Sequence, residues 1–394
     1  MLFFFRRFLL VYMGGLLFAV AQAEPSLIKL AYLSETLAIK KLQSNLTPEL
    51  LDEGVQGALL AIADNNTTGA FTGQRFQMAH VEQLTNPRID KVVGELHDKG
   101  IQYIVANLSL ETLQYIAKQA AMQNILVFNT SVENDDLRQL DCLGNVFNMA
   151  PSYAMKADAL AQFMLKKRWK KWLLVRGESP QDILYSNALK RSAKRFGLSI
   201  VKEKMWPHEH NSRKTTQSDI AVFTQETDYD VVVVADSSDF FGDYLLMNTW
   251  LPRPVAGTQG MVATAWHHKH ERWGGVQIQK RFFKQANRWM TGIDYASWLA
   301  VRAVGEASTR TQSRESPVLK EYLLSDDFSL AGFKGVRLNF RLWNQQLRQP
   351  ILLAIPEAMV AVLPYKEFLH PRTYLDTLGY DQSESNCQLN QSSE

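Results

Sequence analysis

Several signatures of enzymes are missing from this sequence. It contains no G-x-S-x-G turn for a serine nucleophile, no G-x-x-x-x-G-K-[ST] loop for phosphates and no G-x-G-x-x-G turn for a dinucleotide. Cysteine is also scarce: there are two, and neither belongs to a Cys-x-x-Cys redox pair. We therefore expect a protein without enzymatic activity and without a cofactor.

Charge of one sign is not in excess. The formal net charge is +3 over 394 residues, and charged residues make up 21% of the chain. Two basic clusters, residues 166–168 and 170–171, alternate with Trp169 and Trp172, which is the pattern of a solvated face anchored by core aromatics. These features provide no argument for a nucleic-acid partner.

Long hydrophobic runs are missing after the first 23 residues. At the N-terminus, Arg6 and Arg7 precede an apolar stretch over residues 8–20, which ends in the small-x-small sequence of residues 21–23. This pattern predicts a secretory signal peptide cleaved near Ala23, because a membrane anchor, the alternative, needs about 20 apolar residues. The residue directly after the cleavage point is Glu24 and not cysteine, which argues against a lipid anchor. We expect the mature protein to be free in an oxidising compartment.

The two cysteines, Cys142 and Cys387, are an even number in a chain predicted to be exported. Oxidising compartments favour a disulfide, so we expect one bond between them. Two free buried thiols are the alternative. The predicted bond closes a long loop and ties the C-terminal tail to the middle of the chain, which stabilises the fold by a few kcal/mol in the chain-entropy account.

The rest of the chain alternates short apolar runs with helical patterns. Its first part predicts strands at residues 28–33, 76–81, 103–106 and 125–128 and helices at 47–65, 89–99 and 110–123. The rhythm then repeats, with helices at residues 153–167, 184–196 and 215–224, a short helix or turn at 242–248, and strands at 171–176, 198–202 and 231–235. Beyond Gly260 comes a helical region, strongest at 295–306 and 317–324, and then strands at 337–341 and 351–363.

This rhythm predicts an α/β fold of two doubly wound, Rossmann-like lobes joined by a hinge. Strands that alternate with helices are typical of parallel sheets covered on both faces, and a chain of this length exceeds what one hydrophobic core serves. The expected divisions are a signal peptide at 1–23, lobe one at 24–148 plus 260–335, lobe two at 149–259 plus 336–370, and a C-terminal tail at 371–394.

Five segments carry a likeness to a known family through their order and spacing. They are residues 53–58 with 64–66 and 71–74, residues 128–131, residues 150–153, residues 255–260 and residues 294–296. In this order they resemble the type I periplasmic binding proteins, specifically the branch that binds branched-chain amino acids and amides. The resemblance implies a monomer that captures a small polar ligand between two lobes and delivers it to the membrane subunits of an ABC transporter.

A narrower likeness involves the cysteine segments. Asp141-Cys142 and residues 378–381 up to Cys387 resemble the binding proteins associated with PQQ-dependent alcohol dehydrogenase systems, which would place the protein beside periplasmic alcohol oxidation.

Two departures from the amino-acid binders concern the ligand. Residues 34–46 lack the glycines expected there, and Asn107-Leu108-Ser109 replaces a Gly-Ser pair. The ligand need not be an α-amino acid.

Ligands of open α/β sheets bind beyond the carboxyl ends of the strands, where helix N-termini present free N–H groups. In lobe one this rule predicts ligand contacts at Ser34, Glu35, Asn107, Ser109, Asn129, Thr130 and Ser131. In lobe two and at the hinge it predicts Tyr153, Tyr185, Asp236, Ser237, Ser238, Gly257, Thr258 and Gln259. Hydroxyls and N–H groups would hold a carboxylate or carbonyl, and Glu35 or Asp236 an amine. For each Ser or Thr, helix capping is the alternative role.

Histidines support a second hypothesis. His208 and His210 form one group, and His267, His268 and His270 form another. Such tracts suit a transition metal, but neither has His-Glu-x-x-His spacing and both look like solvated turns, so we expect no metal site. The competing function is a metal carrier, for example of lanthanides, or a sensory partner of the alcohol-oxidation system, with ligands from acidic runs such as residues 133–136.

Overall fold

The structure is a computed structural model, which describes residues 25–35, 50–206, 216–226, 228–387 and 389. The predicted signal peptide, most of the loop after the first strand, and the histidines at 208 and 210 lie outside the described residues. No helix among the described residues is long and apolar enough to cross a membrane.

The first sheet is wholly parallel, with the strand order β2-β1-β3-β4-β5. Its strands are β1 (Ser26–Glu35), β2 (Gln74–Leu84), β3 (Tyr103–Asn107), β4 (Leu126–Asn129) and β5 (Val146–Asn148). The connecting helices are α1 (Val55–Thr72), α2 (Asn86–Asp98) and α3 (Leu110–Ala121). Leu30 and Tyr32 pack on one face of this sheet, and Ala31 and Leu33 on the other. The sheet is therefore buried on both faces, as a parallel sheet requires.

The second sheet has the order β15-β14-β10-β9-β8-β6-β7. Its strands are β6 (Lys171–Arg176), β7 (Ser199–Met205), β8 (Val231–Ala235), β9 (Val255–Gly257), β10 (Met261–Thr264), β14 (Ile351–Ile355) and β15 (Ala358–Leu363). β14 runs antiparallel to β10 and β15, while the other strands pair in parallel. Trp172 and Leu174 pack on one face and Leu173 and Val175 on the other. This sheet is likewise covered on both sides.

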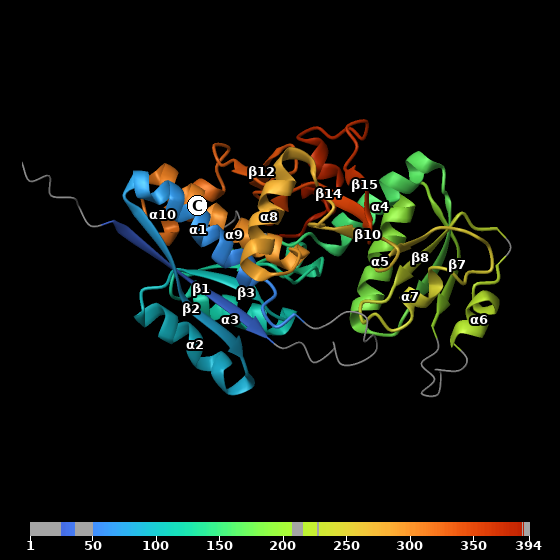
Figure 1. The fold of residues 1–394 in the computed structure, drawn as a ribbon, viewed down its shortest axis with the longest axis horizontal. Coiled ribbons are helices and arrows are strands. Elements are labelled where there is room, and N and C mark those ends of the chain that lie inside the picture. Colours follow the sequence, from blue (N-terminus) through green and yellow to red (C-terminus); the bar gives the residue numbers. More distant parts are fainter. Residues whose placement is uncertain (1–24, 36–49, 207–215, 227, 388, 390–394) are drawn as a thin grey trace, which may run out of the picture.

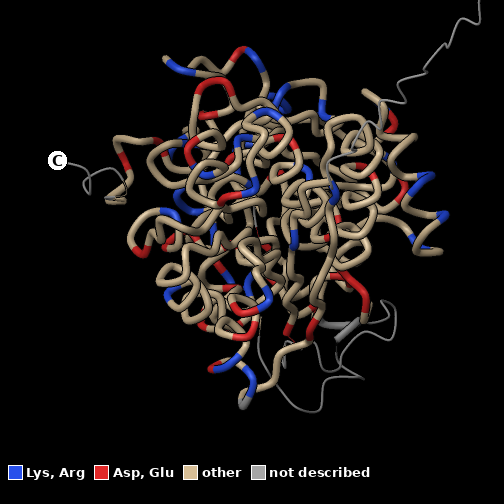
Figure 2. Tube along the Cα trace, turned by 90° about the vertical axis from the view of Figure 1, so that its left-hand side faces the viewer, with Lys and Arg blue, Asp and Glu red and all other residues tan. Residues whose placement is uncertain are grey.

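The remaining elements include a third, small sheet of three strands. Its strands are β11 (Leu330–Ala331), β12 (Arg337–Phe340) and β13 (Leu347–Arg348), and the remaining helices are α4 (Tyr153–Lys167), α5 (Pro180–Arg195), α6 (Thr216–Phe223), α7 (Gly242–Leu245), α8 (Gly275–Ala286), α9 (Gly292–Thr311) and α10 (Ser316–Leu323). Figure 1 shows α1–α3 around the first sheet and α4–α7 around the second, with β10 and β14 between the two groups. Lysines and arginines are interspersed with acidic residues over the chain (Figure 2).

Two local expectations differ from the structure. The first helix begins at Val55 rather than at residue 47, because Gly54 takes a left-handed φ of 84° that interrupts a helix. The region after Gly260 was expected to be helical and to belong to lobe one. It begins instead with β10, which pairs with β9 and β14 in the second sheet. The division of the chain into lobes stays a prediction.

Three crossing segments connect the elements around the two larger sheets. We name them crossing one (residues 149–152, after β5), crossing two (residues 265–274, after β10) and crossing three (residues 341–350, around β13). The C-terminal tail follows β15 and runs from residue 364 to the described end of the chain. It passes close to crossing three before it reaches the first sheet.

Buried charges hold this tail. The Asp376 carboxylate is fully buried and accepts hydrogen bonds from Arg341 Nε at 2.8 Å and Arg348 Nε at 2.9 Å. Three residues later, the Gly379 amide donates to Asp158 Oδ2 at 2.8 Å, and Arg195 donates to the Gly379 carbonyl at 2.6 Å. The Asp376 contacts hold the tail to crossing three, and the Gly379 contacts hold it to α4 and α5.

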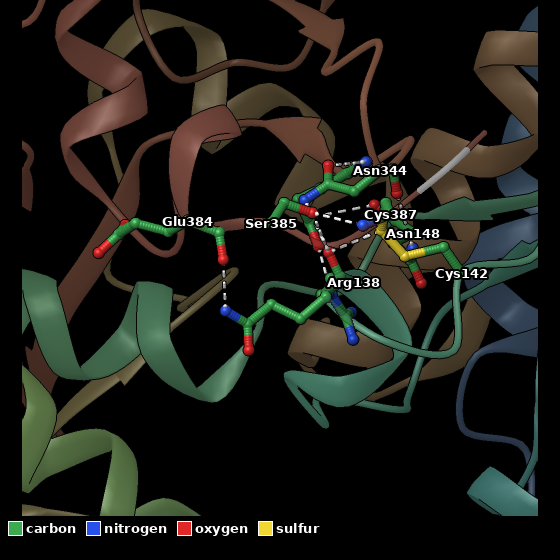
Figure 3. The surroundings of a disulfide bond; sticks show 9 residues. Arg138, Cys142, Asn148, Asn344, Glu384, Ser385 and Cys387 are labelled. Carbon is green, nitrogen blue, oxygen red and sulfur yellow. Dashed lines mark hydrogen bonds between the residues drawn. A yellow bond between two sulfur atoms is a disulfide. The ribbon is translucent and has the colours of Figure 1, made fainter. Parts of the chain in front are cut away.

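The predicted disulfide is confirmed: Cys142 and Cys387 are bonded, 245 residues apart in the sequence. Figure 3 shows the bond beside Arg138, whose carbonyl also lies near Ser385 of the tail. Nearby, Gln139 donates to the Glu384 carbonyl at 3.0 Å. The tail therefore runs from the second sheet to a position next to β5 of the first sheet, where the disulfide holds it.

Removing this bond tests its energetic weight. We expect the double variant Cys142→Ser/Cys387→Ser to lose about 3 kcal/mol of unfolding free energy, because the unfolded chain is no longer constrained by a long loop. Urea unfolding of the purified protein measures the loss. Dithiothreitol should lower the wild type to the level of the variant and leave the variant unchanged; an equal drop in both proteins would show that the loss has another source.

Candidate functional site

A cavity of about 130 Å³ lies where crossings one and two leave the sheets. It is lined by Glu53, Thr130, Ser131, Glu133, Ala150, Pro151, Thr264, Ala265, Gly292 and Ile293. These residues come from five separate stretches of chain: the turn before α1, the end of β4, crossing one, the end of β10 and the start of α9. Because its lining residues come from five stretches of chain, the shape of the cavity depends on how the two sheets are placed relative to each other.

The end of β4 supplies hydroxyl groups that are held in place by the backbone. Thr130 Oγ1 donates to the Ala106 carbonyl at 2.9 Å, and Ser131 Oγ donates to the Leu108 carbonyl at 3.0 Å. Each hydroxyl keeps lone pairs that can accept a further hydrogen bond. The turn is set by Asn129, whose side-chain oxygen accepts from the Val132 amide at 2.9 Å. This part of the cavity is therefore preorganised.

The start of α9 supplies backbone donors. Gly292 and Ile293 occupy its first turn, where the amides of an α-helix have no acceptor within the helix and the dipole favours negative charge. A capping box between Thr291 and Asp294 defines the helix start. Asp294 is fully buried and also accepts from the Gly54 amide at 2.7 Å, which binds α9 to the turn before α1.

Two acidic residues, Glu53 and Glu133, also line the cavity. Glu133 accepts two hydrogen bonds from Lys156 Nζ, at 2.7 and 2.9 Å, so part of its charge is compensated. Its backbone carbonyl accepts from the Tyr153 amide at 2.9 Å, which joins this loop to α4. Burial raises the pKa of the Tyr153 phenol, with the negative charges of Glu133 and Asp135 adding to the shift, so this hydroxyl stays a donor.

Arg138 joins the cavity wall to two crossings. It is 3% exposed and donates to the carbonyls of Val132 and Ala150 at 2.8 and 2.9 Å and to Gln346 Oε1 at 2.5 Å. Burial lowers the pKa of its guanidinium to about 10, which leaves it charged at neutral pH. The loop after β4, crossing one and crossing three are thus fastened to one cation.

A family model described as periplasmic binding protein matches residues 45–242, half of the chain. This chain belongs to the periplasmic binding protein family. The match begins before α1 and ends at the start of α7, so it includes the end of β4 and crossing one. No curated protein matches the sequence.

Solved structures show the same fold over most of the chain. A branched-chain amino acid ABC transporter periplasmic ligand-binding protein from Burkholderia xenovorans LB400 superposes with a TM-score of 0.73 at 16% identity, covering 92% of this chain and 99% of that one. The leucine-, isoleucine-, valine-, threonine- and alanine-binding protein from Brucella ovis, in a closed conformation, gives 0.67 at 16% identity, covering 84% and 89%. A solute-binding protein from R. palustris in complex with benzoate gives 0.62 at 11% identity, covering 86% and 98%. The predicted type I fold is confirmed.

Two of the predicted ligand residues, Thr130 and Ser131, line the cavity of this binding protein. Other lobe-one candidates serve α3 instead. Ser109 is the N-cap of that helix, and Glu35 accepts from the Ser109 amide at 3.0 Å and from Thr112 Oγ1 at 3.1 Å. Ser34 and Asn107 are half-buried at the paired ends of β1 and β3, and Asn129 is the turn residue described above. Their roles as ligand contacts stay predictions.

The lobe-two candidates form a polar cluster at the ends of β8 and β9. Asp236 accepts from the amides of Phe241 and Gly242 at 2.8 and 2.7 Å, so it caps α7, and burial raises the pKa of its carboxyl. Thr258 Oγ1 accepts from the Asp236 amide at 2.8 Å. Ser237 donates to Asp182 at 2.6 Å, Ser238 donates to Asp236 at 3.3 Å and Gln259 donates to the Asp236 carbonyl at 2.8 Å. These residues pair with one another, and their predicted role as ligand contacts stays a prediction.

Gly257, Tyr153 and Tyr185 complete the predicted set. A Cβ at Gly257 would lie 2.1 Å from the Val234 carbonyl, so this position needs glycine for strand packing. The rings of Tyr153 and Tyr185 lie 5.6 Å apart. The Tyr185 hydroxyl is buried without a hydrogen-bond partner among the described residues and does not line the cavity. Direct ligand contact at these three positions stays a prediction.

The sequence analysis did not predict the backbone donors at the start of α9 or the acidic residues that line the cavity. The missed lining residues are Glu53, Glu133, Ala150, Pro151, Thr264, Ala265, Gly292 and Ile293. A signal was present, because the segments around Glu53, Ala150 and Asp294 carried the family resemblance. The strand-end rule passed over them for two reasons: Glu53 and Gly292 lie at a turn and a helix start, and β5 and β10, the strands before Ala150 and Ala265, were not predicted.

The second histidine group is not a solvated turn throughout. His270 is 2% exposed, with its ring 5.1 Å from that of Trp266 and its Nε2 2.8 Å from the Phe333 carbonyl. Burial lowers the pKa of His267 to about 4. Among the described residues, no three His, Cys, Asp or Glu side chains gather in a way that could hold a metal ion. The metal-carrier hypothesis gains no support from this group.

The loop after β4 predicts a pH effect on stability. Asp135 Oδ1 accepts from the Ala154 amide at 3.1 Å, and burial raises the pKa of its carboxyl to about 6. An unfolded chain loses this proton near pH 4, before the folded one does, so the contribution of Asp135 to the unfolding free energy falls as pH rises from about 4 to 6.

Asp135→Asn should remove this fall, because the amide has no proton to lose. We expect the unfolding free energy of the variant relative to wild type to rise by about 2 kcal/mol between pH 4 and pH 7, measured by urea unfolding at each pH. The exposed Asp98→Asn is the control and should show no such change. If the unfolding free energies of wild type and Asp135→Asn changed in parallel with pH, the raised pKa of Asp135 would be contradicted.

Proposed function

We propose that this protein is the periplasmic solute-binding component of an ABC transporter. It captures a small polar solute in the cavity at the crossings and presents it to the membrane subunits. The observation that carries the proposal is this cavity, built from five stretches of chain in a fold shared with ligand-binding proteins of ABC transporters. Membership of the periplasmic binding protein family supports it.

The chemistry of the cavity favours a ligand with groups of two kinds. The first-turn amides of Gly292 and Ile293 and the adjacent helix dipole favour a carboxylate or carbonyl oxygen. The hydroxyls of Thr130 and Ser131 accept hydrogen bonds, and Glu133 faces the same space. An amine or hydroxyl group on the ligand fits that side. A leucine complex in a structure of the same fold, from Desulfitobacterium hafniense, agrees with such a molecule.

The cellular setting follows from the family and the sequence. A periplasmic location agrees with the predicted signal peptide and with the disulfide between Cys142 and Cys387. Hinge closure about the three crossings would enclose the solute. The monomeric state and the link to PQQ-dependent alcohol oxidation stay predictions of the resemblance.

A thermal-shift screen of the chain from Glu24 onward tests the proposal. Amino acids, amides, short acids, alcohols and metal ions are offered one at a time. A bound solute at 100 times its dissociation constant adds about 2.7 kcal/mol to the unfolding free energy, which is readily measured as a rise in Tm. We expect such a rise with one class of small polar solute.

A matched pair of glycine variants places the solute. A Cβ at Gly292 would lie 3.4 Å from Thr264 Oγ1 and 3.8 Å from Ala265, so Gly292→Leu fits the helix and fills the cavity. Gly94 on α2 has no neighbour within 4 Å of its added Cβ, so Gly94→Leu makes the same change away from the cavity. We expect Gly292→Leu to abolish the shift and Gly94→Leu to keep it. Equal shifts in Tm for both variants would show that the solute does not bind in this cavity. A shift with metal ions alone would refute solute capture.

A further inference from the structure

The chain from residue 272 to residue 293 contains no aspartate or glutamate, although it carries five arginines and lysines. This stretch includes α8 and the turns on both sides of it. Two of the five cations are paired: Arg281 with Asp64, and Arg288 with Asp52 at 2.9 Å. Arg272, Lys280 and Lys284 are exposed and have no ion-pair partner among the described residues. Three positive charges therefore remain on this surface.

The outward face of α8 also exposes apolar side chains. Ile278 and Phe282 point into the core, whereas Val276 is 39% and Phe283 40% exposed. A half-exposed tryptophan stands at each end of the helix: Trp273 just before it and Trp289 just after it, 49% and 50% exposed. The Trp289 ring lies 4.8 Å from Phe283, so aromatic surface is continuous along that end.

We call this surface the α8 patch, made of Arg272, Trp273, Val276, Lys280, Phe283, Lys284 and Trp289. The neighbouring charges leave it positive. Glu357 is partnered by Lys269 at 3.5 Å, and the ring of His268 stacks on Trp289 at 5.6 Å. Burial lowers the pKa of His268, so it adds no charge at neutral pH. Glu271 is exposed and adjacent to Arg272 in the sequence, so it offsets one of the three positive charges, and the patch keeps a net positive charge.

From this combination we infer that the α8 patch docks on an anionic lipid surface. Exposed tryptophan and phenylalanine beside lysine and arginine are the groups that insert at a membrane interface, the rings among headgroups and the ammonium groups against phosphates. The inference goes beyond solute capture, since it would keep the receptor near the membrane that holds its transporter.

Co-sedimentation with vesicles tests the inference on the chain from Glu24 onward, because the apolar leader would itself bind lipid. Vesicles contain phosphatidylcholine with or without one third phosphatidylglycerol, at low salt. We expect binding to the anionic vesicles only. Lys280→Glu/Lys284→Glu should weaken it at least tenfold, since each cation near an anionic surface contributes measurably to binding.

Lys194→Glu/Lys202→Glu is the matched control. Both lysines are exposed, have no ion-pair partner among the described residues and lie on α5 and β7, away from α8. This variant has the same net charge as Lys280→Glu/Lys284→Glu and should retain most of the binding. Equal losses of vesicle binding in the two variants would show an effect of net charge and would overturn the inference that the α8 patch binds the lipid.

A separate variant tests the aromatic residues of the α8 patch. Phe283→Ser/Trp289→Ser should also weaken binding at least tenfold and should reduce quenching of tryptophan fluorescence by brominated lipid to the part that comes from Trp273. Absence of binding to pure lipid, together with patch-dependent binding to vesicles carrying the transporter, would overturn the inference in favour of a protein partner. The solute-induced shift in Tm should persist in all these variants, so failure of this inference and failure of solute capture are distinguishable.

Discussion

The buried Asp294 carboxylate holds the elements on which the cavity depends. Its oxygens accept hydrogen bonds from the Gly54 amide, from both terminal nitrogens of Arg288 and from the amide and hydroxyl of Thr291. A buried carboxylate is stable only when it is satisfied in this way. The result is a fixed start for α9. A Cβ at Gly57 would lie 1.9 Å from the Asp294 carbonyl, so the close approach of α1 requires glycine.

The second constraint is the way in which the sheets are joined. Three crossings connect them, and Arg138 fastens two of these to the wall of the cavity. The tail adds a fourth connection, held by Asp376 near crossing three and by the disulfide beside β5. Any opening and closing has to be accommodated by these connections together, and the cavity lies where two of them leave the sheets.

The fold was predictable from the sequence because its elements are long and regular. The expected limits of the helix Tyr153–Lys167 and the strand Lys171–Arg176 match the structure, since a helical pattern is followed by a buried apolar run. β5, β9 and β10 have only three or four residues, too few for a periodic signal, and they were missed.

The site was less predictable for a different reason. Of the residues that the strand-end rule predicted, Thr130 and Ser131 line the cavity, whereas the carboxylates of Glu35 and Asp236 accept hydrogen bonds from backbone amides at helix starts. Sequence spacing cannot distinguish a side chain that serves a helix end from one that faces a ligand. The donors at Gly292 and Ile293 are backbone groups, and their position depends on contacts with Gly54, which is more than 200 residues away in the sequence.

The central claim is that the cavity at the crossings is the solute site. A crystal structure of the protein from Glu24 onward, with a solute selected by thermal shift, tests it most directly. The account predicts a solute oxygen within hydrogen-bonding distance of the Gly292 or Ile293 amide and a further contact with Thr130 or Ser131. A solute bound elsewhere, for example in the groove beside Lys118 and Lys320, with the cavity at the crossings empty, would contradict it.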